Sequence, residues 1–152
     1  AAMQQYADKP ALRSFGQTLS YADVNRLSSA FAAYLQNVVG VKKGDRVALM
    51  MPNVLQYPVS TAAVLRAGYA VVNVNPLYTP RELDLQLRDS GAEVLVVLDH
   101  FGDKVTSVVP GTAVKTVELW VKGRPAGWRD QSGQRRPRHR YRARQERRGS
   151  NA

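Results

Sequence analysis

Four residues suited to ligand contact follow two apolar runs of this sequence. Asn53 comes after RVALMM, and Asn75, Pro76 and Tyr78 come after YAVVNV. An asparagine amide both donates and accepts hydrogen bonds, and a tyrosine hydroxyl does the same beside an aromatic ring. Ligands of open α/β sheets bind beyond the carboxyl ends of the strands, where these residues would lie. If this chain lines a substrate cavity, we expect these four residues to form its rim, although the stronger interpretation is that asparagine and proline here form turns and helix caps.

A third apolar run, AEVLVVL, is followed by an acid and an imidazole, Asp99 and His100. Such a neighbouring pair can take part in general acid–base catalysis. No serine in a nucleophile elbow accompanies it, the chain has no cysteine, and His139 is the only other histidine. A histidine in a loop is also commonly just solvated. We therefore predict no catalytic residue and no metal site in this chain.

Sequence motifs for phosphate binding are also missing. Neither GxxxxGK[ST] nor GxGxxG occurs, and the stretch GRPAG at residues 123–127 has no hydroxyl side chain and no lysine. Backbone amides and a lysine are what such loops use to hold a triphosphate. We therefore expect this chain by itself to bind no cofactor.

The three apolar runs alternate with two segments long enough for helices. This order predicts strand, helix, strand, helix, strand across residues 46–98. The runs are rich in valine at successive positions, as in parallel strands buried on both faces, so the predicted class is α/β with a parallel sheet. The expected caps and stops are Asn53 and Gly68 for the first helix, and Thr79, Pro80, Glu82 and Gly91 for the second.

Further elements are expected on either side of this unit. A short strand is predicted at residues 9–15, with a hairpin turn at Gly16 and Gln17. Ser20 opens a helix that Gly40 ends, and AVKTVELWV alternates enough to form one more strand. One face of that helix is expected to carry Val24, Leu27, Phe31, Tyr34, Leu35 and Val38.

Four segments carry a family resemblance: SYADVNRLSSAFAAYL, KKGDRVALMMPNVLQYP, VLRAGYAVVNVNPLYTPREL and DSGAEVLVVL. In this order and spacing, over residues 9–117, they resemble the N-terminal part of bacterial long-chain fatty-acid CoA ligases, which are AMP-forming acyl-CoA synthetases. The resemblance implies the parallel-sheet N-terminal subdomain of such a synthetase. It also implies that the intact enzyme uses ATP, Mg2+ and CoA, and converts a fatty acid to acyl-CoA, AMP and pyrophosphate through an acyl-adenylate.

The family's serine/threonine/glycine-rich loop, its adenine- and ribose-binding segments, its hinge and its C-terminal catalytic lysine have no counterpart here. We therefore expect an N-terminal fragment that is inactive alone, from a cytoplasmic enzyme that associates peripherally with the inner face of the membrane. The missing remainder would leave one sheet face partly exposed, so we also expect self-association. The strand residues concerned are Val47, Leu49, Val72, Val74, Leu95 and Val97.

The tail, residues 122–152, differs from the rest of the chain in charge. Residues 1–121 hold 11 Lys/Arg and 10 Asp/Glu, a net charge of +1, whereas the tail holds 11 Lys/Arg and 2 Asp/Glu, a net charge of +9. Its large apolar groups are Trp128 and Tyr141, so we expect it to be disordered. Three explanations stay open: non-specific nucleic-acid binding, binding to anionic lipid, and a shifted reading frame without an evolved role. The first two would make the chain a non-enzymatic basic module, which is the alternative to a partial N-terminal AMP-binding domain at residues 1–121.

Overall fold

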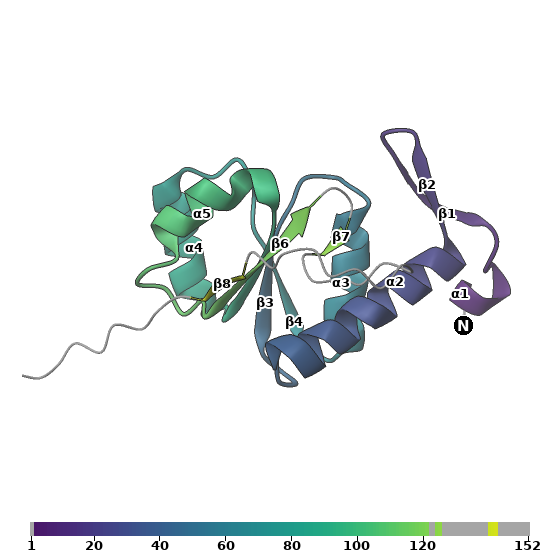
Figure 1. The fold of residues 1–152 in the computed structure, drawn as a ribbon, viewed down its shortest axis with the longest axis horizontal. Coiled ribbons are helices and arrows are strands. Elements are labelled where there is room, and N and C mark those ends of the chain that lie inside the picture. The colour runs from purple at the N-terminus through teal and green to yellow at the C-terminus, as the bar shows by residue number, and fades with distance from the viewer. Residues whose placement is uncertain (1, 122–123, 126–139, 143–152) are drawn as a thin grey trace, which may run out of the picture.

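The computed structural model describes residues 2–121, 124–125 and 140–142 of the chain. A sheet lies between two layers of helices, and a separate two-stranded hairpin extends to one side (Figure 1). The strands are β1 (Pro10–Ser14), β2 (Gln17–Ser20), β3 (Arg46–Met50), β4 (Ala70–Asn73), β5 (Val94–Leu98), β6 (Thr116–Val121), β7 (Arg124–Pro125) and β8 (Arg140–Arg142). The helices are α1 (Ala2–Gln5), α2 (Tyr21–Tyr34), the π-helical η1 (Leu35–Val39), α3 (Gln56–Arg66), α4 (Pro80–Ser90), the 3-10 turn η2 (Asp99–Phe101) and α5 (Gly102–Val108).

The main sheet has the strand order β4-β3-β5-β6-β7, and β8 also pairs with β6. Its first four strands are parallel, so that Val47 of β3 lies opposite Val71 of β4 on one side and Val94 of β5 on the other. Parallel neighbours need long crossovers, and α3, α4 and α5 lie in these connections. The predicted α/β class with a parallel sheet is confirmed, as is the further strand in AVKTVELWV.

Each face of the sheet carries its own hydrophobic core. The helices α2 and α3 cover one face, and α4 and α5 cover the other (Figure 1). The expectation of a partly exposed face is therefore wrong for the central strands, because helices of this same chain supply the cover. Of the six strand residues concerned, Val72 on β4 is half-buried, and the buried ones are Val47, Leu49, Val74, Leu95 and Val97.

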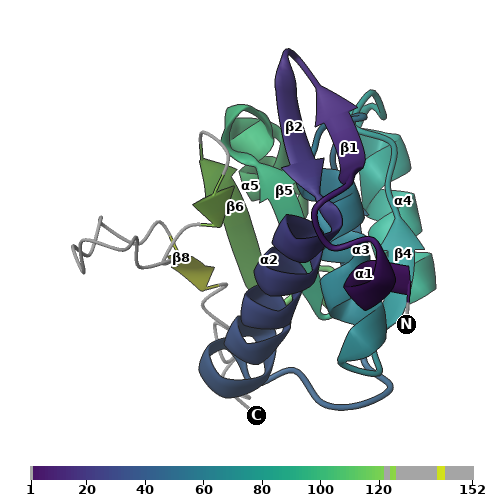
Figure 2. The ribbon, with the colours of Figure 1, turned by 90° about the vertical axis from the view of Figure 1, so that its right-hand side faces the viewer.

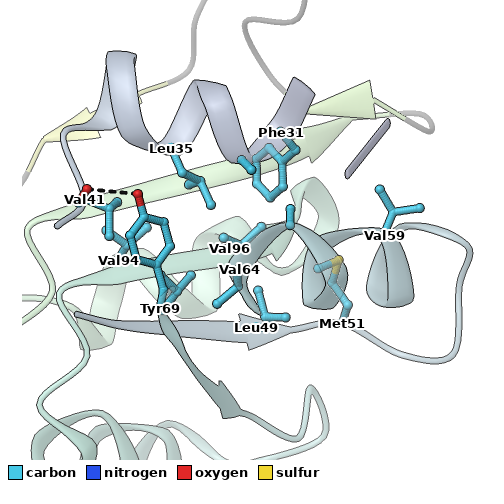
Figure 3. Close-up of a cluster of buried hydrophobic side chains, with 13 residues drawn as sticks. Phe31, Leu35, Val41, Leu49, Met51, Val59, Val64, Tyr69, Val94 and Val96 are labelled. Atoms are coloured by element: carbon cyan, nitrogen blue, oxygen red, sulfur yellow. Dashed lines mark hydrogen bonds between the residues drawn. The ribbon is translucent and has the colours of Figure 1, made fainter. Parts of the chain in front are cut away.

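The core under α2 shows how the helix and the sheet meet (Figure 3). Phe31 and Leu35 reach from the helix toward Leu49 on β3, and all three are fully buried. Burying a side chain of this size stabilises the fold by roughly 1.5–3 kcal/mol. The Tyr69 hydroxyl closes the cluster by donating to the Val41 carbonyl at 2.9 Å, and burial raises the pKa of Tyr69. Figure 2 shows α2 running along the near side of the sheet, beside α3.

The predicted ends of the helix α2 are confirmed. The Ser20 hydroxyl accepts from the Asp23 amide at 3.1 Å, and the Asp23 carboxylate accepts from the Ser20 amide at 3.2 Å. The helix continues into η1 and stops at Gly40, whose φ is 83°. Val38 departs from the predicted apolar face and is 41% exposed, because the wider π-helical turn changes the direction of its side chain.

The predicted helix ends are confirmed for α4, but the predicted start of α3 is wrong. For α4, the cap Thr79, the following proline, the Glu82 contact and the stop at Gly91 are all confirmed. For α3, Asn53 is not the cap; Leu55 holds that position and makes no side-chain hydrogen bond. The chain after β3 first makes a tight turn, with the amide of Val54 donating to the carbonyl two residues earlier at 2.8 Å, so the helix begins later than predicted.

The hairpin β1–β2 turns at Phe15 and Gly16, one residue before the predicted Gly16 and Gln17. Ser14 pairs with Gln17, and the two linking residues have φ of 47° and 74°. Positive φ at both positions is typical of two-residue turns whose twist matches that of the strands. The Phe15 side chain is 90% exposed, so the backbone of the turn, and not packing of this ring, determines the local structure.

Two short parts of the tail are described as strands. β7 pairs antiparallel with the end of β6, and β8 pairs with its beginning, where Val117 lies opposite Tyr141. Composition alone did not indicate these strands. The rest of the tail lies outside the described residues, and the prediction of disorder therefore falls mostly outside them too.

Candidate functional site

The connectivity of the sheet indicates where a ligand would bind. From β3 the chain crosses through α3 to β4, and from β4 it crosses through α4 to β5 on the opposite side of β3. The direction of winding therefore reverses between β3 and β5. In open α/β sheets the crevice beyond the carboxyl ends at such a switch point is the usual ligand site. Here it is bordered by the loop at residues 51–55 and by η2.

The four predicted rim residues all lie at this carboxyl end of the sheet. Asn53 is exposed in the loop after β3 and therefore borders the switch point. Asn75, Pro76 and Tyr78 follow β4, the outer strand next to β3. The structure thus brings the four residues to one end of the sheet but divides them between two loops. Their contact with a substrate stays a prediction.

The loop after β4 is held by its own residues. The Asn75 side-chain oxygen accepts from the Leu77 amide at 2.9 Å, and the Asn75 carbonyl accepts from the Tyr78 amide at 3.1 Å. This is an Asx-type turn, in which the asparagine shapes the backbone. Tyr78 is half-buried against the core under α4 and α5. The geometry supports the structural interpretation of Asn75 more directly than the ligand-binding one.

Lys104 ties this loop to α5. Its ammonium group donates to the Pro76 carbonyl at 3.0 Å and to the Tyr78 carbonyl at 2.9 Å, and it lies 5.7 Å from the centre of the Phe101 ring. The contact joins the segment after β4 to the segment after β5. Sequence reasoning missed Lys104, because an isolated lysine forms no pattern and its partners stand 28 and 26 positions earlier in the chain.

Asn73, the last residue of β4, is fixed from both faces of the sheet. The Tyr57 hydroxyl of α3 donates to its side-chain oxygen at 2.6 Å, and the Gln86 amide of α4 donates to its carbonyl at 2.8 Å. Two helices on opposite faces therefore hold the point where β4 leads into the predicted rim. No sequence motif marks this arrangement, because all three residues are common on protein surfaces.

Asp99 and His100 do not form an acid–imidazole pair in the structure. The Asp99 carboxylate accepts from the backbone amide of His100 at 2.9 Å, and the imidazole packs on the Phe101 ring with the centres 3.9 Å apart. Both residues are exposed. The acid therefore bonds to the backbone of its own 3-10 turn. That the pair is not catalytic stays a prediction.

A hollow of about 350 Å3 lies at the opposite end of the sheet, where β3, β5 and β6 begin. Three of its four charged side chains contact one another or the backbone. The Lys115 ammonium lies 2.7 Å from the Glu93 carboxylate, and the Asp45 carboxylate accepts from the Lys42 amide at 2.8 Å. Ligands of such sheets usually bind at the other end, so this hollow is not the expected site.

The described residues do not fit ATP and Mg2+ as a catalytic site. They contain no cluster of three or more His, Asp or Glu side chains that could hold a metal ion. The loops at the carboxyl end offer neither a glycine-rich phosphate cradle nor a lysine beside one. We assign no reaction step to this part of the chain. Within the same residues, no helix is long and apolar enough to cross a membrane.

Comparison with known proteins defines the class. The AMP-binding enzyme family matches residues 1–147, and the chain belongs to this family. The parallel sheet also matches the N-terminal domains of AMP-forming ligases. The long-chain-fatty-acid–CoA ligase of Archaeoglobus fulgidus, for example, superposes with a TM-score of 0.72 at 25% identity, over 78% of this chain and 25% of that one.

Curated relatives at 53–55% identity are long-chain-fatty-acid–CoA ligases. The long-chain-fatty-acid–CoA ligase of Escherichia coli O157:H7 is 55% identical over 119 residues, which cover 78% of this chain and 21% of the relative. The ligase of the same name from Haemophilus influenzae is 53% identical over 122 residues, or 80% of this chain and 22% of the relative. The chain thus spans about a fifth of the length of the curated relatives it matches.

Proposed function

We propose that this chain forms part of a long-chain fatty-acid CoA ligase. The intact enzyme would join a fatty acid to CoA through an acyl-adenylate, using ATP and Mg2+ and releasing AMP and pyrophosphate. The observation that carries the proposal is the 55% identity to such ligases over 119 residues. A stretch of 119 residues in this chain extends over several strands and helices, so the similarity is not confined to one motif.

The role proposed for this part is to build the sheet and to present the loops at its carboxyl end. Asn53, Asn75, Pro76 and Tyr78 would border the substrate cavity there, with Lys104 holding the second loop in place. The triphosphate and the reacting carboxylate would be held by parts of a ligase that have no counterpart in this sequence. We propose a cytoplasmic location, with peripheral contact at the membrane from which the fatty acid is taken.

A chimeric ligase tests this assignment. Residues 9–121 would replace the matching segment of the E. coli ligase, and fatty-acid-dependent release of pyrophosphate would be measured. We expect activity within about tenfold of the parent, or ~1.4 kcal/mol in barrier height. A chimera with Leu49→Asp in the buried strand β3 is the control for a disrupted sheet. A folded chimera without activity would contradict the assignment.

The 152-residue chain assayed alone tests the second half of the proposal. We expect no pyrophosphate release above a blank without protein, because the described residues offer no site for the triphosphate. Release that depends on added fatty acid would show that the chain holds catalytic groups of its own. The nucleic-acid or lipid-binding alternative concerns the tail and stays a prediction.

A further inference from the structure

The main sheet contains one buried acid. Glu118 on β6 is 2% exposed, and among the described residues it is the only charged side chain that is buried. Its carboxylate accepts from the Tyr34 hydroxyl of α2 at 2.8 Å, so it lies on the face of the sheet that α2 covers. A hydroxyl group donates a hydrogen bond but brings no charge. Because buried carboxylates in proteins are usually paired with a positive group, the position of Glu118 points to a cation on the same face.

The strand β8 places arginines at that face. It pairs antiparallel with β6, on the side away from β5 (Figure 2). Each of its three residues stands opposite one residue of β6: Arg140 opposite Glu118, Tyr141 opposite Val117, and Arg142 opposite Thr116. Directly opposed residues of an antiparallel pair lie on the same face of the sheet. The register therefore assigns both arginines to the face that carries the buried acid.

The pattern of β8 matches both faces of the sheet. Val117 belongs to the core under α4 and α5, and the aromatic residue of β8, Tyr141, stands opposite it. The basic residues stand on the other face, with Arg140 at the position of Glu118. A shift of the register by one residue would bring tyrosine to the face of the acid and arginine to the apolar face. The sequences of the two strands therefore favour the register that the structure has.

We propose that Arg140 is the counter-charge of Glu118, and that this pair fastens the basic tail to the outer side of β6. The charge distribution agrees, because residues 1–121 carry a net charge of +1 and residues 122–152 a net charge of +9. A strand added to a sheet edge is bound by main-chain hydrogen bonds and selected by its side chains. In this pairing Glu118 selects the segment, and β8 is a strap from the same chain.

This role for residues 140–142 is separate from binding of nucleic acid or lipid by the tail. It also does not depend on the proposed ligase function, because both members of the pair and both strands belong to this chain. The strap makes a specific demand on position. The charge at residue 140 should matter more than the same charge two residues further along the same strand.

Hydrogen exchange of the backbone amides of β8, in the full 152-residue chain, tests this demand. Arg140→Glu places a second acid opposite Glu118. Arg142→Glu is the matched control, because it makes the same change of charge on the same face of the same strand, but opposite Thr116. We expect Arg140→Glu to lower the protection of these amides at least about tenfold. Arg142→Glu should lower it less than about threefold, because its acid lies only diagonally from Glu118.

Glu118→Gln separates the ion pair from other effects of charge. Glutamine is close to glutamate in size, is neutral, and can still accept from the Tyr34 hydroxyl. In this background Arg140→Glu should lower protection no more than Arg142→Glu does, because the two positions no longer differ in what they face. If Glu118→Gln does not fold, the comparison of positions 140 and 142 still decides.

Three results would overturn the proposal. The first is that the amides of β8 in the natural chain exchange as fast as those of an unstructured peptide. The second is an equal loss of protection from Arg140→Glu and Arg142→Glu. The third is a larger loss from Arg140→Glu that persists in the Glu118→Gln background.

Discussion

α3 and α4 are both 11 residues long and both connect neighbouring parts of one sheet, but they begin differently. α4 begins with a capping box between Thr79 and Glu82, whereas Leu55 before α3 offers no side-chain hydrogen bond. α3 buries four residues and α4 only two. Hydrogen bonds at its ends therefore specify α4, and packing against α2 and the sheet specifies α3.

The contact between α2 and α3 shows what packing supplies. Ser28 on α2 and Ser60 on α3 are both fully buried, and small side chains allow neighbouring helices to fit closely. Arg66 in the last turn of α3 donates to the Asn25 carbonyl at 3.0 Å and to its side-chain oxygen at 2.9 Å. α3 is thus positioned along its length by α2, and its first turn contributes little.

Removing a core side chain should have the largest effect on either helix. Leu87→Ala on α4 should lower the free energy of unfolding by about 2–5 kcal/mol, because it leaves a cavity in the second core. Val64→Ala on α3 should cost about 1.5–3 kcal/mol. Leu85→Ala is the control, since Leu85 is 69% exposed and its loss should change stability by about 0.5 kcal/mol or less. Urea unfolding measures all three, and equal losses at positions 85 and 87 would contradict the packing described.

A side-chain cap should contribute to stability at the start of α4 but not at the start of α3. Thr79→Ala should cost about 1 kcal/mol, because the first turn of α4 loses the acceptor for the Glu82 amide. Asn53→Ala should change the free energy of unfolding by about 0.5 kcal/mol or less, since Asn53 caps nothing. A larger loss at Asn53 than at Thr79, in thermal or urea unfolding, would reverse the comparison.

Removing one buried hydroxyl group from α3 should stabilise the fold. The Ser60 hydroxyl is fully buried and has no hydrogen-bond partner among the described residues, so Ser60→Ala should raise the free energy of unfolding by up to about 1 kcal/mol. Ser28→Ala is the matched control, because the Ser28 hydroxyl donates to the Val24 carbonyl at 2.6 Å. Destabilisation by Ser60→Ala would show that the hydroxyl has a partner.

Acid should weaken the start of α4 more than that of α3. The backbone hydrogen bond from Thr79, followed by that of its side chain, lowers the pKa of Glu82, and α3 has no acid in its first turn. Because the folded-state pKa lies below the unfolded-state value of about 4.3, the contribution is present above that pH and lost as pH falls through the folded-state pKa. Glu82→Gln should therefore be less stable than the natural chain at neutral pH, and the difference should shrink as the pH falls through the folded-state pKa of Glu82. A difference that does not change with pH would contradict the shift.

The sequence predicted those parts of the fold whose causes are local. Thr79, Glu82 and Gly91 have residue types and spacings that occur together at helix ends, so α4 was placed correctly. Asparagine is a common helix cap, so Asn53 was predicted to cap α3. Where α3 begins depends on a turn that forms only between β3 and the packed helix. The hairpin turn lies one residue earlier than predicted. Phenylalanine rarely adopts a positive φ, so the sequence did not indicate Phe15 as a turn residue.

For the candidate site, the sequence identified the end of the sheet but not its internal contacts. The rim residues lie at the carboxyl end because strands and helices alternate, which the apolar runs already indicate. The switch point between β3 and β5 follows from strand order, and Lys104 reaches carbonyls of a distant loop. Neither can be read from residue spacing along the chain, because both depend on which strands become neighbours.

Amide hydrogen exchange along β3 and β5 gives the most direct test of the two-faced core. It shows whether a chain that spans about a fifth of its relatives' length can cover both faces of its own sheet. Amides of these strands that bond to a neighbouring strand should exchange only through global unfolding, with one shared free energy of about 5–15 kcal/mol. They should be the slowest in the molecule, because each strand is buried between two layers of helices. Exchange at the rate of an unstructured peptide, or protection that is lower in β3 and β5 than in α4, would contradict a two-faced core.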